Sequence, residues 1–329
     1  MKIKQKIICT ALAAASSIGT AFAADYTLRV AHQYPGSHHI AQALDGFEKE
    51  VETNSDGRIE IEIFGGAQLY GPTQFHSAVA RGQIESAAII SLIWGGTIPE
   101  MQVFNIPYLL TDAERLEAFP SSQAADLLDQ KLEAKGVKNL SWMLDSNNLI
   151  FTSNNAPLVE PDDFSGIKIR GLSRIFDEGL IALGASPTSM PGSEAYQALQ
   201  TGVVDSAITS IGAAYSRRYF EVQDYGTASN MIAVYSNLVI NPQFWESLPQ
   251  DLQEIVATAA QNAEKPLLPQ DNSLDQQGID TLEENGMEVT ALTEEQEAAW
   301  KAIMQPAIQE AFLKSAPDGE QLIEILENL

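Results

Sequence analysis

One stretch, residues 163–209, constrains the fold more than any other part of the chain. It has the pattern strand, helix, strand, helix, strand, with a serine able to cap the start of each helix and a glycine at the end of each. The expected elements are a strand at 167–170, a helix from Ser173 to about 183, a strand at 186–189, a helix from Ser193 to about 201 and a strand at 203–209. A β-α-β-α-β unit builds an open parallel sheet, so we expect an α/β fold.

Arg170 is the candidate functional residue of this unit. It stands at the C-terminal end of the first expected strand, and ligands of open α/β sheets bind at the carboxyl ends of strands. A rigid guanidinium fork suits a carboxylate there. The alternative is an arginine on the surface that takes part in a salt bridge.

A short repeat indicates a second unit of the same kind. Residues 78–87 (AVARGQIESA) precede residues 198–207 (ALQTGVVDSA) by 120 positions, and both combine a helix end, a glycine and the entry of a strand. One such match could arise by chance, or because many helices end in a glycine that is followed by a strand. Because both copies follow a strand and a loop, we favour two related lobes, and a cleft between lobes is the usual place for a small-molecule site.

The first 23 residues have the pattern of a signal peptide. Three lysines precede a short apolar run, and Ala21-Phe22-Ala23 forms an A-x-A cleavage site. We expect cleavage after Ala23, export to the periplasm and no membrane insertion of the mature chain. The single cysteine, Cys9, lies inside the peptide, so neither a disulfide framework nor thiol chemistry is expected afterwards.

Size and charge limit the remaining classes. Cleavage leaves 329 − 23 = 306 residues, enough for two lobes of about 150 residues each. With three lysines removed, 16 basic and 44 acidic residues give a net charge of −28. So acidic a chain argues against nucleic acid as a partner, because phosphate binding needs clustered Lys and Arg.

The expected lobes are discontinuous. The first lobe takes residues 24–145 and about 236–272, and the second takes 146–235 and about 273–329. The first crossing is expected near 145–149 and the second just before or within the strand at 231–240.

Motifs of catalysis are missing. The sequence has no G-x-S-x-G, G-x-G-x-x-G, P-loop lysine, H-E-x-x-H or EF-hand loop, so we expect neither an enzyme nor a cofactor. His38 and His39 are the one tempting metal pair. Adjacent residues of an extended segment point to opposite faces, so we expect no metal site.

The segment 166–205 resembles the extracytoplasmic solute-binding proteins of TRAP transporters, the DctP-type family. It carries G-x-K-I-R, then L-G-A-x-P, then M-P-x-S-E-x-Y-x-A-L-Q-T-G-V-V-D. Further similar segments are AHQYP, GRIEIEIF, IPEMQVFNIPYLL and KLEAKGVK.

The resemblance implies a two-lobed periplasmic binding protein fold of the Venus-flytrap type, with the ligand cleft between the lobes. It implies a monomer that captures a small organic solute and delivers it to a TRAP permease of two membrane subunits, driven by an ion gradient. The arginine of the family's K-I-R motif, which clamps a ligand carboxylate, falls on Arg170. A sensing subunit that signals to a receptor, or an enzyme on the same architecture, are the alternatives.

Three departures from the family pattern bear on the ligand. Leu149 stands where many members have a second arginine, Gly192 where an aromatic residue is usual, and Thr209 where asparagine is common. These changes favour a monocarboxylate or a zwitterion over a dicarboxylate, with a small amine or amino alcohol as the alternative. The expected ligand residues are Arg170, Thr209, Gln33, Tyr34, Trp94, Asp145, Asn147 and Tyr215.

Overall fold

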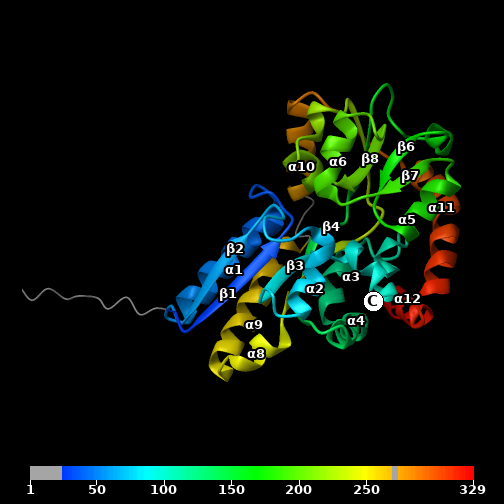
Figure 1. Ribbon diagram of the computed structural model, residues 1–329. Helices are drawn as coiled ribbons and strands as arrows, with labels where there is room; N and C mark the ends of the chain where they lie inside the picture. Colours follow the sequence, from blue (N-terminus) through cyan, green and yellow to red (C-terminus); the bar gives the residue numbers. More distant parts are fainter. Residues whose placement is uncertain (1–23, 269–272) are drawn as a thin grey trace, which may run out of the picture.

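The computed structural model describes residues 24–268 and 273–329. The expected signal peptide, residues 1–23, lies outside them. The described strands form one sheet in the order β2-β1-β3-β10-β4 and another in the order β11-β9-β5-β8-β6-β7. The α/β fold with two lobes is confirmed, and Figure 1 shows one lobe built around each sheet.

The first sheet contains β1 (Tyr26–His32), β2 (Ile59–Phe64), β3 (Ser86–Ile90), β4 (Lys138–Ser146) and β10 (Val234–Ile240). The second contains β5 (Leu149–Ser153), β6 (Lys168–Gly171), β7 (Ser186–Ser189), β8 (Ser206–Ser210), β9 (Tyr225–Ser229) and β11 (Glu288–Ala291).

Five strands of each sheet have the same topology, and the second sheet has β11 as a sixth strand, parallel to β9. A central strand, β1 or β6, pairs in parallel with the next strand of the chain on one side (β2 or β7) and with the third on the other (β3 or β8). The third strand pairs antiparallel with β10 or β5, and that strand in turn pairs antiparallel with β4 or β9. The register also matches, because Ala31 pairs with Ala87 where Arg170 pairs with Ala207.

The repeated sequence lies at equivalent places. In each copy a glycine with positive φ, Gly82 (65°) or Gly202 (71°), follows the helix. Its N–H bonds to the carbonyl three residues back, and the next N–H bonds five residues back. This is the Schellman arrangement, in which a left-handed residue satisfies the last carbonyls of the helix.

The helices of the first lobe lie on both faces of its sheet. α1 and α9 pack together over one face, where α1 buries Ile40, Leu44, Phe47 and Val51 at helical spacing. α2, α4 and the 3₁₀ segment Pro99–Asn105 belong to the core on the other side. The helices are α1 (His39–Asn54), α2 (Phe75–Ala80), α3 (Ala113–Ala118), α4 (Gln123–Ala134), α8 (Pro242–Ser247) and α9 (Gln250–Glu264).

The second lobe is covered by α5 and α11 on one side and by α6, α7 and α10 on the other. Gly179 of α5 lets α11 approach closely, since a Cβ there would lie 2.6 Å from Ile308 Cδ1. The helices are α5 (Arg174–Ala182), α6 (Gly192–Gln200), α7 (Ile211–Ser216), α10 (Ser273–Glu284) and α11 (Glu294–Ser315).

One expected cap is right and the other is wrong. Ser173 caps α5, because its hydroxyl accepts the Phe176 N–H at 3.2 Å. Ser193 was expected to cap α6, but it lies inside the first turn, and Pro191 with φ −55° and ψ 144° is the residue that precedes the helix. A proline is suited to this entry because its φ is already fixed near the helical value.

The chain passes from the first sheet to the second at residues 147–148, between β4 and β5, and returns at 230–233, between β9 and β10. α12 (Gly319–Glu327) packs against α4 and the segment Pro99–Asn105, although the sequence assigned residues up to 329 to the second lobe. Its contact depends on apolar residues such as Leu322 and Leu326, which join the core beside the first sheet.

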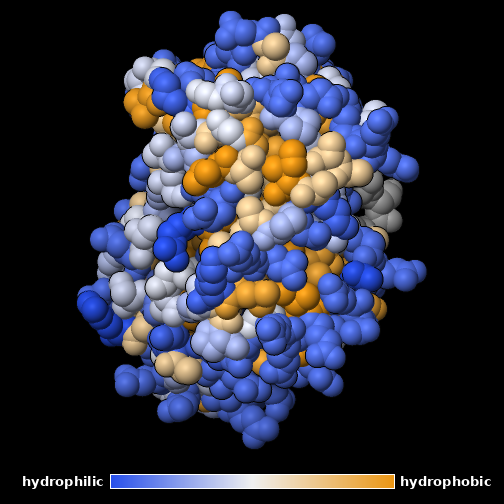
Figure 2. Space-filling view, turned by 90° about the vertical axis from the view of Figure 1, so that its right-hand side faces the viewer, coloured by the Kyte–Doolittle hydropathy of each residue, from blue (hydrophilic) through white to orange (hydrophobic). Residues whose placement is uncertain are grey.

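No described helix combines the length and apolar character needed to cross a bilayer. On the face beside α11 and α12 hydrophilic residues predominate, with apolar side chains gathered toward its middle (Figure 2).

Candidate functional site

A cavity of about 590 Å³ lies between the two lobes. Its volume is in the range of ordinary small-molecule sites. The first lobe contributes a largely apolar wall with Ile90, Leu92 and Ile93, from the end of β3 and the segment after it. The second lobe contributes the ends of β6 and β8, the start of α5, and the segment that leads from β7 into α6.

Arg170 is held at this cavity by the backbone of its own lobe. Its Nε and Nη2 donate to the Met190 carbonyl at 3.1 and 2.9 Å, and its Nη1 donates to the Ile208 carbonyl at 2.6 Å. The residue is only 6% exposed. Burial lowers the pKa of the Arg170 guanidinium, and the positive charge of Arg217 lowers that pKa further. Three of its five N–H groups are used, and two remain for another acceptor.

Two further arginines, Arg174 and Arg217, line the cavity. Arg174 is the first residue of α5, and Arg217 follows the last residue of α7. Arg217 was given no role from the sequence, and with Leu149 in place of a second arginine we predicted one cation fewer than many family members have. The available signal was a pair of arginines at a helix end in a strongly acidic chain.

Asp145 is the centre of a hydrogen-bond network on the opposite side. Its Oδ2 accepts from the Tyr34 hydroxyl at 2.9 Å, and its Oδ1 accepts from the Ser210 hydroxyl at 3.2 Å. Ser236 on β10 hydrogen-bonds the same Tyr34 hydroxyl. Burial raises the pKa of Tyr34 well above its usual range, and the charge of Asp145 adds to the increase. The network connects Tyr34, Asp145 and Ser236 of the first lobe with Ser210 of the second.

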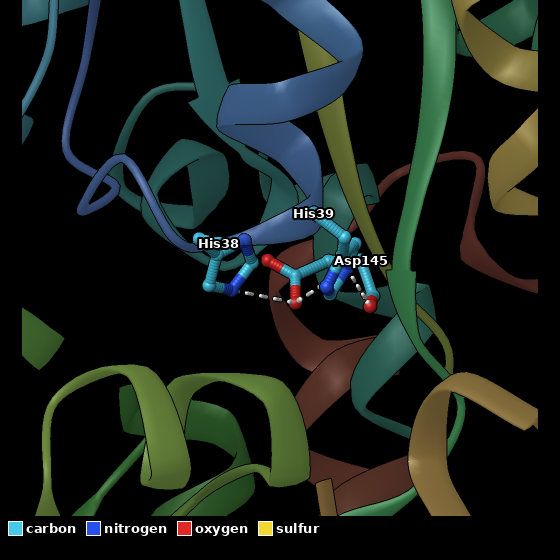
Figure 3. A group of neighbouring side chains, drawn as sticks. All are labelled: His38, His39 and Asp145. Atoms are coloured by element: carbon cyan, nitrogen blue, oxygen red, sulfur yellow. Dashed lines mark hydrogen bonds and ion pairs between the residues drawn. The ribbon is translucent and has the colours of Figure 1, made fainter. Parts of the chain in front are cut away.

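His38 and His39 were expected to point to opposite faces, and this is wrong. His38 has an extended backbone and caps α1, but His39 is already the first residue of that helix, so the two residues do not alternate as in a strand. Their rings stack at 4.3 Å between centroids, and both face Asp145 (Figure 3). Donor atoms of these three residues lie within 4.8 Å of one another.

The hydrogen bonds of these rings do not favour a metal. His38 Nδ1 accepts the Ile40 N–H at 3.3 Å, so its Nε2 carries the proton. His39 Nε2 lies 2.6 Å from the Asp145 carbonyl, which can only accept, so this nitrogen is also protonated. A metal binds an unprotonated nitrogen. For His38 Nε2 to bind a metal, the hydrogen bond from the Ile40 N–H to His38 Nδ1 would have to break. For His39 Nε2 to bind a metal, its hydrogen bond to the Asp145 carbonyl would have to break.

Five of the eight expected ligand residues line the cavity: Arg170, Thr209, Gln33, Tyr34 and Asp145. The carbonyl oxygen of the Gln33 side chain is buried without a hydrogen-bond partner. Two of the positions that depart from the family pattern, Leu149 and Gly192, also line the cavity.

The other three expected residues lie outside this lining. Trp94 is buried in the first-lobe core with its ring 4.9 Å from that of His76. The Asn147 amide donates to the Thr111 carbonyl at 3.3 Å beside the crossing. Tyr215 packs against Gly278 of α10, on the outer side of α7. Trp94 and Tyr215 pack against neighbouring elements of their own lobes, and Asn147 is held by the backbone at the crossing.

Comparison with known proteins gives a consistent result. The family described as bacterial extracellular solute-binding protein, family 7 (DctP), matches residues 30–315. A C4-dicarboxylate-binding periplasmic protein DctP of Rhodobacter capsulatus is 30% identical over 308 residues, 92% of this chain and 90% of that protein. The ectoine-binding periplasmic protein TeaA of Halomonas elongata is 30% identical over 331 residues, 98% and 94% of the two chains.

Among solved structures, a TRAP periplasmic solute-binding protein from Desulfovibrio salexigens with bound orotic acid superposes with a TM-score of 0.86. It is 27% identical, and the match covers 92% of this chain and 98% of that one.

Proposed function

The chain belongs to family 7 of the bacterial extracellular solute-binding proteins, and from this premise we propose that it captures a small organic acid for a TRAP permease of two membrane subunits. The family consists of periplasmic binding proteins for transport and is not an enzyme family. In this proposal the mature chain starts after Ala23 and acts as a monomer in the periplasm.

The charge of the cavity carries the proposal. Of the described residues that line it, the charged ones are Arg170, Arg174, Arg217 and Asp145, three cations against one anion. The whole chain has a net charge of −25. Cationic residues are therefore concentrated where the protein as a whole is acidic, and such a site attracts anions. An amine or amino alcohol is the less favourable ligand for the same reason.

Arg170 is the proposed carboxylate anchor. Its guanidinium is fixed by the Met190 and Ile208 carbonyls, and its two unused N–H groups can form a bidentate pair with a carboxylate. Asp145 and the unpartnered oxygen of Gln33 can accept hydrogen bonds from a hydroxyl or amino group of the same ligand. A hydroxylated carboxylic acid or a zwitterion would satisfy both sides.

Closure of the two lobes around the ligand strengthens its binding. The two crossings, 147–148 and 230–233, are the segments about which one lobe can rotate. Closing brings the apolar wall of the first lobe over the arginines of the second. Water leaves the site, and the ion pair becomes stronger because the local dielectric constant falls.

The proposal is tested by thermal-shift screening of the mature protein with organic acids, zwitterions and amines, since a ligand that binds the native state raises its melting temperature. Acids or zwitterions should stabilise it, and Arg170→Ala should weaken the best of them by a factor of about ten or more in calorimetry. Arg170→Lys keeps the positive charge but lacks the planar guanidinium, so its affinity should lie between those of the wild type and Arg170→Ala. Stabilisation by amines alone, or unchanged affinity of Arg170→Ala, would contradict the proposal.

A further inference from the structure

Two consecutive arginines at the end of α7 have different surroundings. Arg218 adopts a left-handed backbone conformation, with φ 61°, and its exposed side chain forms an ion pair with Glu221. Arg217 lines the cavity. Of the described residues, no carboxylate lies within ion-pair distance of Arg217 or Arg170. Arg217 is therefore a cation of the site, whereas Arg218 belongs to the surface.

Gly192 provides the space that Arg217 occupies. A Cβ at Gly192 would lie 2.8 Å from Arg217 Nη1, 3.1 Å from Cζ and 3.4 Å from Nη2. The guanidinium therefore lies against the backbone at the first residue of α6, closer than any side chain there would permit. Because the guanidinium is the mobile end of a flexible side chain, a larger residue at 192 would displace it without unfolding the helix.

Arg170 and Arg217 also affect each other. The positive charge of Arg217 lowers the pKa of the buried Arg170 guanidinium. Two cations close together in a partly enclosed site repel each other, and this unfavourable energy is removed when anionic groups bind between or beside them. An acceptor group near each guanidinium would remove more of it than one carboxylate alone.

We propose that Arg217 is a second ligand-binding residue, that Gly192 is required for its position, and that the ligand presents to it an acidic group separate from the carboxylate on Arg170. This inference rests on the proposed function, which supplies the first carboxylate. Gly192 and Arg217 then act as one specificity-determining pair. Arg217, at the end of α7, then replaces the second arginine that many family members have at the position of Leu149.

The test uses matched acids that differ in one acidic group: succinate against butyrate, and glucarate against gluconate. Calorimetry on the mature wild-type protein should show, in at least one pair, binding of the diacid about tenfold or more tighter than the monoacid. Arg217→Ala should remove that preference and leave the monoacid affinity within about twofold, since only the contact to the second group is lost. Arg218→Ala, the neighbouring surface arginine, should keep the wild-type preference.

Gly192→Ala tests the pairing of the two residues. It should lower diacid affinity severalfold in the wild-type background and have no further effect in Arg217→Ala, because the displaced group is then absent. The melting temperature of ligand-free Arg217→Ala should equal or exceed that of the wild type, because a repulsion is removed. A purely structural arginine would instead lower it and weaken all ligands alike.

The outcomes separate the two proposals. If none of the acids, in these pairs or in the wider screen, binds the wild-type protein, the proposed function fails. If acids bind and depend on Arg170, but diacids have no advantage or keep it in Arg217→Ala, only the role of Arg217 is wrong. Additive effects of Gly192→Ala and Arg217→Ala would overturn the pairing.

Discussion

The two lobes place different residues at the same point of the same sheet. On β1, Ala31 lies opposite Ala87 and is 1% exposed, in the core of the first lobe. On β6, the equivalent residue opposite Ala207 is Arg170, whose guanidinium reaches the carbonyls of Met190 and Ile208. The two lobes therefore share the strand arrangement, but only the second lobe has a charged, hydrogen-bonding residue at this position. The second lobe offers the arginine two carbonyl oxygens that accept three hydrogen bonds, and the first lobe surrounds the equivalent position with apolar side chains.

The cavity walls differ in the same way. The second lobe contributes all three arginines, and the first contributes Ile90, Leu92 and Ile93 together with the polar residues Gln33 and Asp145. An apolar wall that closes over charged groups excludes water without competing for their hydrogen bonds. The second lobe therefore supplies the cationic groups, and the first lobe supplies most of the apolar surface that encloses them.

The largest effect is expected from transferring the arginine to the first lobe. Ala31→Arg would bury a cation among apolar side chains, and burying an unpaired charge is strongly unfavourable. We expect the free energy of unfolding, measured with urea, to fall by about 3 kcal/mol or more.

Thr27→Arg is the control for this change, because Thr27 is an exposed residue of the same strand. It should stay within about 0.5 kcal/mol of the wild type. Equal stability of both variants would show that the strand end of the first lobe tolerates an arginine as that of the second lobe does, and would contradict the proposed difference between the lobes.

A smaller effect concerns a buried carboxyl group of the first lobe. Glu264 accepts the Trp142 N–H at 2.6 Å, and burial raises its pKa to about 7, with Asp129 contributing. Because the folded-state pKa lies above the ordinary 4.5, the stabilising neutral form is fully present below pH 4.5 and is lost as the pH rises through 7. Glu264→Gln should be more stable than the wild type by about 2 kcal/mol at pH 8.

At pH 4.5 the two proteins should be of similar stability, since the wild-type carboxyl group is then neutral when folded. Glu254→Gln, at an exposed position of the same helix α9, serves as the control. A Glu264→Gln variant that gains nothing between pH 5 and pH 8 in urea unfolding would contradict the expected titration.

The smallest effect tests the likeness of the lobes directly. Gly82→Ala and Gly202→Ala each force a side chain into a left-handed conformation, and neither added Cβ would clash with a neighbour. Each should therefore cost about 1 kcal/mol of unfolding free energy. Gly46→Ala, inside α1 with ordinary φ and free space, should instead stabilise by about 0.5 to 1 kcal/mol. Clearly unequal costs at 82 and 202 would weaken the equivalence of the two caps.

Much of the fold could be predicted because the signals were local. The periodicity of residues 163–209, the capping hydroxyl of Ser173 and the two glycines at 82 and 202 each fix a few neighbouring residues. The ten-residue repeat extended this to two lobes of one topology, which the sheet orders confirm. Arg170 was found because a strand end is a position that sequence can define.

The misplaced and missed residues depended on contacts between distant segments. Trp94 is buried with its ring beside that of His76, and Tyr215 packs against Gly278. The paired orientation of His38 and His39 follows from the start of α1 and not from an extended strand. Arg217 was missed because its importance depends on Gly192, 25 positions earlier, and on a helix end whose direction the sequence does not give.

By itself, the sequence determined the α/β units, their glycine caps, the acidic character of the chain and the candidate arginine at position 170. Each of these depends on the conformational preference of a few adjacent residues or on composition. Only the tertiary structure decided which side chains share the cavity, that Arg174 and Arg217 join Arg170 there, and that Asp145 links both lobes through Tyr34 and Ser210. Those arrangements arise from packing between segments far apart in the chain, and no local preference specifies them.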